Sequence, residues 1–190
     1  AVLALACACS SSALADHGRL EVIPPAENPY GIPYSEWVAR WWQWALSVPA
    51  DHNPILDSTG ADAGQGQAGG VFFVAGTATT DPVQREFTVP YGQALFFPLI
   101  NTVWVATEPT DPQDEAGILA IIEPYEASKL ECRLDGQKLK KPASFYTRSG
   151  LFDVALPEGN VFGLPPATYG PAMSVGYYVF IAPPAVGRHE

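Results

Sequence analysis

The sequence predicts a mainly β domain, an antiparallel β-sandwich of the jelly-roll type with one or two packed helices. Apolar and polar residues alternate over many short stretches, which is the period of a half-buried strand. Turn-forming residues are abundant, with 19 Pro and 17 Gly in 190 residues and no repeating period. Short strands between frequent turns are typical of sandwiches and jelly rolls, and the length fits one domain.

Residues 1–15 have the pattern of a signal peptide. An apolar run of small residues extends from Ala1 to Cys9, a serine stretch follows, and residues 13–15 read Ala-Leu-Ala, a cleavage signal. The charged segment and the Met that would begin such a peptide are absent, so we expect it to be truncated at its N-terminus. Cleavage would leave Cys132 as the single cysteine and no internal disulfide. The predicted location is secreted or periplasmic.

The clearest predicted helix begins with Ser35 as its N-cap and is stopped by Pro49. Three aromatic residues recur on one face at helical spacing: Trp37, Trp41 and Trp44. We expect this stripe to pack against a sheet, because large aromatic side chains stabilise most when they are buried. Trp42 lies at the edge of the stripe and is the aromatic residue that we expect to reach solvent.

Alternating stretches predict strands at residues 20–23, 71–75, 85–89, 94–98, 102–106, 145–147, 152–155 and 174–181. Asp135-Gly136 predicts a tight hairpin between strands at 129–134 and 137–140. In the first of these strands Cys132 alternates with leucines, which places it on the buried face.

A second helix is predicted to begin at Asp111, with Pro112 at its first position. Its expected inward residues are Ala116, Leu119 and Ala120. Residues 188–190 resemble the first residues of a strand, so we expect the domain of residues 16–190 to lack its last strand.

Acidic residues outnumber basic ones by 20 to 10, which gives a formal net charge of -10. A nucleic-acid-binding protein needs clustered Lys and Arg to displace counterions from phosphate. The one basic concentration alternates with apolar residues, as a solvated strand face does: Lys129, Arg133, Lys138, Lys140 and Lys141. Nucleic acid and an anionic membrane surface are therefore not expected partners, and no membrane span is predicted.

A set of short motifs gives the chain a recognisable pattern: residues 34–37 (YSEW), 40–45 (RWWQWA), 56–60 (LDSTG), 66–67 (GQ) and 71–76 (VFFVAG). With these motifs the chain resembles a family of secreted bacterial proteins that are described only as hypothetical or signal-peptide proteins. The resemblance covers most of the mature chain and implies no activity. Relatives in that family can carry cysteines near the positions of Ala63 and Phe87, and this sequence has neither.

Candidate ligand-binding residues are found on the predicted helix and in the long loop of residues 49–70. They are Trp42, Gln43, His52, Asp57 and Asp62. Carboxylate and amide oxygens suit Ca²⁺, although the spacing matches no EF-hand loop, and a lone His does not make a zinc site. The alternative is a turn network in which Asp and Asn side chains accept bonds from the backbone. No catalytic residues, cofactor or metal site are otherwise predicted.

Three classes of function are compatible with this sequence. The leading hypothesis is a non-catalytic, secreted binding or surface-interaction domain for carbohydrate or another extracellular ligand, because aromatic residues are plentiful and no catalytic motif is present. One alternative is a hydrolase or lyase that acts on extracellular polysaccharide. The other is a structural protein of the cell envelope. Fold class alone does not choose among them.

Overall fold

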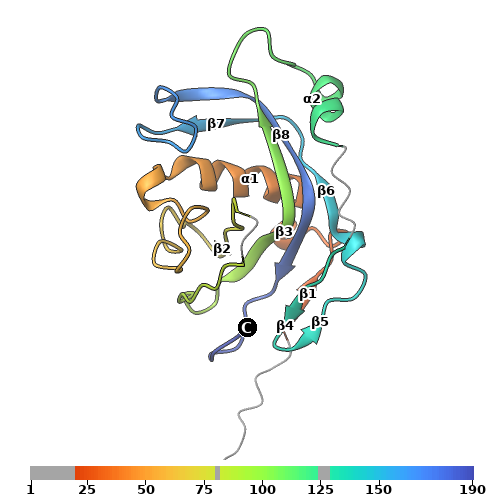
Figure 1. Ribbon diagram of the computed structural model, residues 1–190. Coiled ribbons are helices and arrows are strands. Elements are labelled where there is room, and N and C mark those ends of the chain that lie inside the picture. Colours follow the sequence, from red (N-terminus) through yellow and green to blue (C-terminus); the bar gives the residue numbers. More distant parts are fainter. Residues whose placement is uncertain (1–19, 80–81, 124–128) are drawn as a thin grey trace, which may run out of the picture.

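The computed structural model describes residues 20–79, 82–123 and 129–190, so the predicted signal peptide lies outside the described residues. Two long antiparallel strands, β3 (Ala94–Val105) and β8 (Ala167–Ile181), form the centre of a curled sheet (Figure 1). Helix α1 (Tyr34–Ser47) lies on one face of this pair, and α2 (Glu115–Ile122) lies on the other.

Shorter strands complete the sheet on both sides of the central pair. Strand β2 (Val71–Phe73) runs parallel to β3. The opposite side of β8 is paired in succession with three antiparallel strands: β1 (Val22–Ile23), β6 (Tyr146–Arg148) and β7 (Phe152–Leu156). A separate hairpin joins β4 (Arg133–Leu134) to β5 (Gln137–Lys138). Short 3₁₀ turns occur at Pro29–Gly31, Ala50–His52 and Pro142–Phe145.

Strand β8 is buried on both faces, which explains its nearly continuous apolar sequence. Because successive side chains point to opposite faces, Tyr178 and Phe180 pack toward α1, whereas Val179 and Ile181 pack toward the β4–β5 hairpin. The approach of β3 to β8 is close at Gly176. A Cβ atom there would lie 2.6 Å from the carbonyl oxygen of Ile100, so no larger residue fits without a shift of the backbone.

A bulge in β3 changes which residues face α1. The pairing with β8 shifts between Pro98 and Ile100. Phe96 packs against α1 before the bulge, and Val103 packs on the same side after it, although an offset of seven positions would place them on opposite faces of a regular strand. A bulge adds one residue to one strand and turns the side chains that follow to the other face. The two predicted strands at 94–98 and 102–106 are one strand that contains this bulge.

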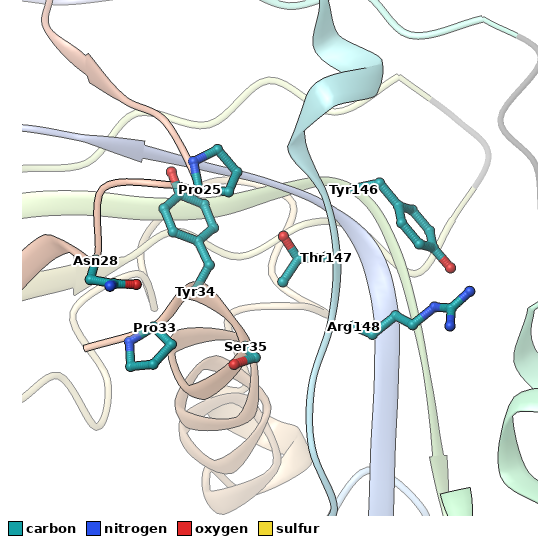
Figure 2. Close-up of a pocket in the computed structure, with 8 residues that line it drawn as sticks. All are labelled: Pro25, Asn28, Pro33, Tyr34, Ser35, Tyr146, Thr147 and Arg148. Atoms are coloured by element: carbon teal, nitrogen blue, oxygen red, sulfur yellow. The ribbon is translucent and has the colours of Figure 1, made fainter. Parts of the chain in front are cut away.

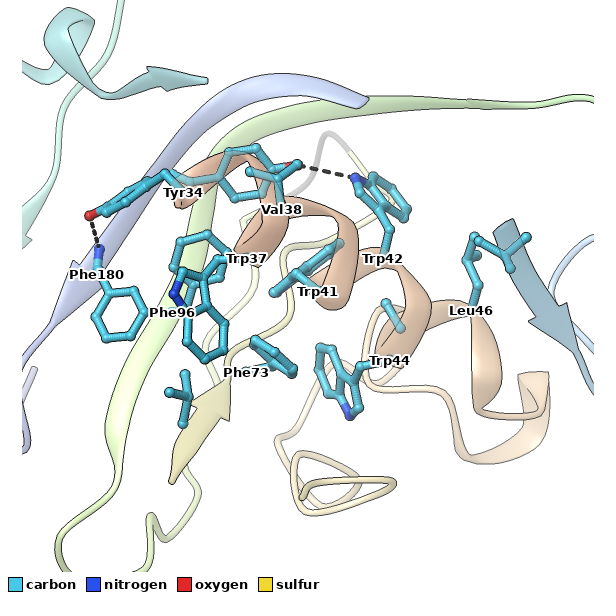
Figure 3. Close-up of a cluster of buried hydrophobic side chains, with 14 of the residues drawn as sticks. Tyr34, Trp37, Val38, Trp41, Trp42, Trp44, Leu46, Phe73, Phe96 and Phe180 are labelled. Atoms are coloured by element: carbon cyan, nitrogen blue, oxygen red, sulfur yellow. Dashed lines mark hydrogen bonds between the residues drawn. The ribbon is translucent and has the colours of Figure 1, made fainter. Parts of the chain in front are cut away.

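The predicted packing of the aromatic stripe on α1 is confirmed. Trp37, Trp41 and Trp44 are buried against Phe73 of β2 and Phe96 of β3 (Figure 3). These rings meet mostly edge to face, an arrangement that aromatic pairs favour. The packing holds the helix across the sheet.

The predicted start of α1 was two residues too late. Pro33 is the N-cap, and its carbonyl accepts bonds from the N–H groups of Glu36 and Trp37, so Ser35 lies inside the helix. No side chain caps this end. The predicted end is correct, since Val48 is extended ahead of Pro49.

Helix α2 begins later than predicted. Its N-cap is Asp114, whose carboxylate accepts a 2.7 Å bond from the N–H of Gly117. Asp111 instead accepts bonds from the backbone of the preceding turn. The buried residues of α2 are Ile118 and Ile122, and Leu119 packs beside them as predicted, whereas Ala116 and Ala120 are exposed.

The prediction of a mainly β fold with few helices is confirmed, whereas the antiparallel sandwich is not. The sheet is open, curled and mixed, and α1 covers the face that a second sheet would cover in a sandwich. Residues 85–89 form no strand, and residues 188–190 contact the β4–β5 hairpin without joining the sheet. The hairpin itself is confirmed, with positive φ at Asp135 (49°) and Gly136 (74°).

Candidate functional site

Trp42 is the predicted site residue that the structure places most differently. We expected it to reach solvent, but only 9% of its surface is exposed. Its indole N–H donates to Ser174 Oγ at 2.7 Å and to the Tyr178 hydroxyl at 3.0 Å. The expectation failed because those two polar groups on the inner face of β8 give the indole N–H a buried partner, and such a partner makes burial favourable.

A small polar cluster surrounds this indole in the core. The Tyr178 hydroxyl also meets Ser174 Oγ at 2.9 Å and accepts a 3.1 Å bond from Asn101, while Ser174 Oγ donates to the carbonyl of Thr102. Burial raises the pKa of Tyr178 to about 12, and the bonds from Ser174, Asn101 and Trp42 oppose part of that rise. The hydroxyls are saturated by protein partners, so this cluster joins α1 to the sheet.

Gln43 lies on the exposed side of α1 and is occupied by the sheet. Its side-chain amide donates a 3.0 Å bond to the carbonyl of Asp153 in β7. The bond ties the helix to the bulged strand, where the pairing with β8 shifts. Gln43 therefore has a structural partner.

The loop of residues 49–70 is organised by Asp57 and Asn53, as the turn-network alternative predicted. The Asp57 carboxylate accepts bonds from the Thr59 hydroxyl and from the N–H groups of Thr59, Gly60 and Asp62. The Thr59 hydroxyl bond and these backbone bonds hold the pKa of Asp57 well below its usual range. Asn53 is buried and donates to the carbonyls of Ala45 and Val48 at the end of α1.

Arg85 anchors this loop from the other side. Its guanidinium donates to the carbonyls of Asp57, Ala75 and Gly76 at 2.7–2.8 Å. Burial lowers the pKa of Arg85, and the nearby Asp57 charge opposes that change. The stretch predicted as a strand at 85–89 therefore serves as a clamp on the loop.

Three of the predicted site residues meet in this loop, but not as a reactive set. His52 Nδ1 lies 3.4 Å from Asp62 Oδ1, and the N–H of Asp62 bonds to Asp57. His52 is largely exposed. Across the described ranges, no group of three His, Cys, Asp or Glu side chains could hold a metal ion. Trp42 and Gln43 lie on α1 with the separate partners described above.

An open cleft of about 520 Å³ lies between the start of α1 and strand β6 (Figure 2). Eight residues line it. The N-terminal arm and the start of α1 contribute Pro25, Asn28, Pro33, Tyr34 and Ser35, and β6 contributes Tyr146, Thr147 and Arg148. In Figure 2 the side chains of Tyr146 and Arg148 lie on the far side of β6 from Ser35. At Tyr146 and Arg148 the cleft is therefore lined by the backbone of β6 and not by the side chains. A second hollow, of about 250 Å³, lies between β1 and the β4–β5 hairpin.

The cleft was not predicted from the sequence. Its N-terminal wall is part of the Pro-rich arm that precedes α1, and its other wall is a strand of three residues. Proline density was a signal for an irregular arm, but no local pattern indicates that β6 lies opposite that arm. The two segments are separated by more than 100 positions in the chain.

Comparisons with known proteins add no assignment. No protein-family model, curated protein or solved structure matches this chain. Among the described residues, no helix has the length and apolar character needed to cross a membrane.

Proposed function

We propose that this chain is a secreted, non-catalytic binding domain and that its ligand site is the cleft between α1 and β6. The observation that carries the proposal is the composition of the cleft. Pro25, Pro33 and Tyr34 provide apolar walls, and Asn28, Ser35 and the backbone of β6 provide hydrogen-bonding groups. Ligand sites commonly combine such walls with a few polar groups, and volumes of about 300–1,000 Å³ are typical.

The same composition favours binding over catalysis. None of the lining residues is Asp, Glu, His or Cys. General acid–base catalysis usually uses such a group within hydrogen-bond reach of the substrate, and a serine nucleophile needs an adjacent base. The alternative, a hydrolase or lyase acting on polysaccharide, would be strengthened by His52 within hydrogen-bond reach of Asp57. His52 lies beside Asp62 instead, and Asp57 accepts bonds from the loop backbone. A structural envelope protein remains the other alternative, and oligomeric state tests it.

The carbohydrate hypothesis now depends on tyrosine rather than tryptophan. The indoles of α1 are buried, so they offer no stacking surface for a sugar ring. Tyr146 is 36% exposed and meets Tyr177 edge to face at 5.3 Å between ring centroids. Tyr146 lies on the far side of β6 from Ser35, so a sugar ring stacked on it would lie outside the cleft.

A glycan array and a peptide library, both applied to the purified protein, test the proposal. Ser35→Arg places a long side chain in the cleft and should abolish binding of any ligand that either screen identifies. Ser47→Arg, at the exposed last residue of the same helix, is the matched control and should bind as the parent protein does. Ligands that bind both variants equally, or turnover of a polymer substrate, would refute a non-catalytic site in this cleft.

A further inference from the structure

The backbone of β6 exposes hydrogen-bonding groups toward the cleft. Among the described residues β6 pairs with β8 alone, so its other side is an edge of the sheet. Thr147 is opposite Gly176, and Ser149, two residues further along, donates its N–H to the carbonyl of Ser174 at 2.9 Å. Antiparallel pairs alternate between those that exchange bonds and those that do not.

This alternation fixes which groups of β6 point outward. Because the N–H of Ser149 bonds to β8, the backbone N–H and C=O of Thr147 also point toward β8. The backbone groups of Tyr146 and Arg148 point away from it. The N–H of Tyr146 bonds to the carbonyl of Ala143 in the preceding turn. The carbonyl of Tyr146 and both backbone groups of Arg148 remain, and no described residue contributes a hydrogen bond to them. They lie along the cleft.

The neighbouring edge groups of the sheet are occupied by the chain itself. Gln43 of α1 bonds to the carbonyl of Asp153 in β7. At the opposite edge, Gln67 bonds to both backbone groups of Phe73 in β2. Proteins usually cover unpaired strand edges, because an open edge is a template for another strand. No described residue covers the outward groups of Tyr146 and Arg148 in β6 in this way, and this open stretch coincides with a cleft.

From this geometry we infer that the cleft binds an extended peptide segment of another protein, which adds to the sheet as a strand beside β6. This inference rests on the proposed binding function and names its ligand class. A peptide residue opposite Arg148 exchanges two main-chain bonds with it, and a third bond forms at the carbonyl of Tyr146. Main-chain bonds of this kind give affinity, and pockets for alternate side chains give specificity.

The electrostatic potential at the start of α1 favours an acidic peptide. The Arg148 guanidinium lies on the far side of β6 and pairs with Glu123, so the positive potential at the cleft comes from the first turn of α1, the positive end of the helix dipole. At physiological ionic strength the screening length is about 8 Å, so this nearby potential acts more strongly than the net charge of the whole chain. A basic peptide would find no carboxylate among the lining residues.

Two variants of the protein test the main-chain contact. Arg148→Pro removes the outward N–H but leaves the ladder with β8 intact, since proline is tolerated where the N–H faces away from the sheet. Arg148→Ala removes the guanidinium and keeps the N–H. The probe is a synthetic acidic heptapeptide enriched from a random library on the parent protein, measured by calorimetry. We expect Arg148→Pro to bind at least about tenfold more weakly than Arg148→Ala, because one bond is lost and the ring obstructs the edge.

N-methylation of the peptide provides the second measurement. Each backbone amide of the heptapeptide is methylated in turn, and binding should be lost at alternate positions and retained at the positions between them. Equal tolerance at all positions, or equal affinity of the Pro and Ala variants, would overturn the strand addition while leaving a cleft that Ser35→Arg blocks. A glycan that competes in place of any peptide overturns the ligand class. Dimerisation of the parent protein that Arg148→Pro abolishes would show that a second copy occupies the edge.

Discussion

Two edges of the same sheet are treated differently in this protein. At β2, the side-chain amide of Gln67 donates to the carbonyl of Phe73 at 2.7 Å and accepts from its N–H at 3.0 Å. One glutamine thus satisfies both outward groups of that residue, as a neighbouring strand would. At β6, Arg148 has the same two outward groups, and a cleft lies beside them.

The difference depends on which segments of the chain lie beside each edge. The β2 edge lies next to the long loop, which Asp57, Asn53 and Arg85 fix in place, so Gln67 is delivered to Phe73 by an ordered segment. The β6 edge faces Pro25 and Pro33, which have no N–H to donate. One edge of the sheet is thus covered and the other is open, and single substitutions can test this difference.

The largest expected effect comes from proline at adjacent positions of β6. Thr147→Pro removes the N–H that faces β8 and should lower the free energy of unfolding by at least about 2 kcal/mol, because the buried strand loses a ladder bond. Arg148→Pro should stay within about 0.5 kcal/mol of Arg148→Ala, since both variants lose the ion pair with Glu123 and the N–H that proline removes faces away from β8. Urea denaturation measures both. Equal destabilisation by the two prolines would mean that the inferred alternation of β6 is wrong.

A second test concerns β1, which pairs with β8 on the same side as β6 and is also bridged to it by a side chain. The Tyr34 hydroxyl accepts a 3.0 Å bond from the N–H of Phe180 and donates to the carbonyl of Ile23. Tyr34→Phe leaves both buried groups without this partner and should cost about 2 kcal/mol of stability. Tyr30→Phe is the control, because Tyr30 is 58% exposed. A loss that is the same for both variants would contradict the bridging role.

Removal of Gln67 should make the β2 edge resemble the β6 edge. Gln67→Ala deletes both bonds to Phe73 and the bond to Ala63, and we expect a loss of about 1–2 kcal/mol because these groups are partly reached by water. The same variant should associate at high concentration, since the opened edge can pair with another copy. Light scattering and thermal unfolding measure these effects. Gln84→Ala, an exposed residue, should change neither.

The sequence predicted the parts of the fold that depend on local pattern. The stripe on α1, the Asp135-Gly136 hairpin and the Asp57 network all follow from residues within a few positions of one another. The prediction for Trp42 failed because its partners, Ser174 and Tyr178, are more than 130 positions away. Long-range pairing also determines the cleft and its open edge, so neither could be read from local periodicity.

The smallest expected effect concerns the C-terminal residues, which contact the hairpin and neither edge. His189 Nδ1 lies 2.8 Å from Asp135 Oδ2, and its other ring nitrogen lies 2.8 Å from the carbonyl of Ala185. The bond to Asp135, together with that carbonyl, raises the pKa of His189 above its usual value. A raised pKa means that this stabilisation is fully present below about pH 6.5 and is lost as the pH rises through the folded-state pKa.

We therefore expect amide exchange of residues 186–190 to rise on going from pH 6 to pH 8 by more than the intrinsic pH dependence of exchange. Exchange at Phe73 and Thr147 should follow the intrinsic rate over the same range, because the interactions at the two edges contain no group that titrates there. His189→Gln should remove the excess and leave the cleft unaffected. An excess that persists in His189→Gln would show that His189 is not its cause. An excess that also appears at Thr147 in β6 would show that the C-terminal residues and the open edge are coupled, so the two edges could not be compared independently of the C-terminus.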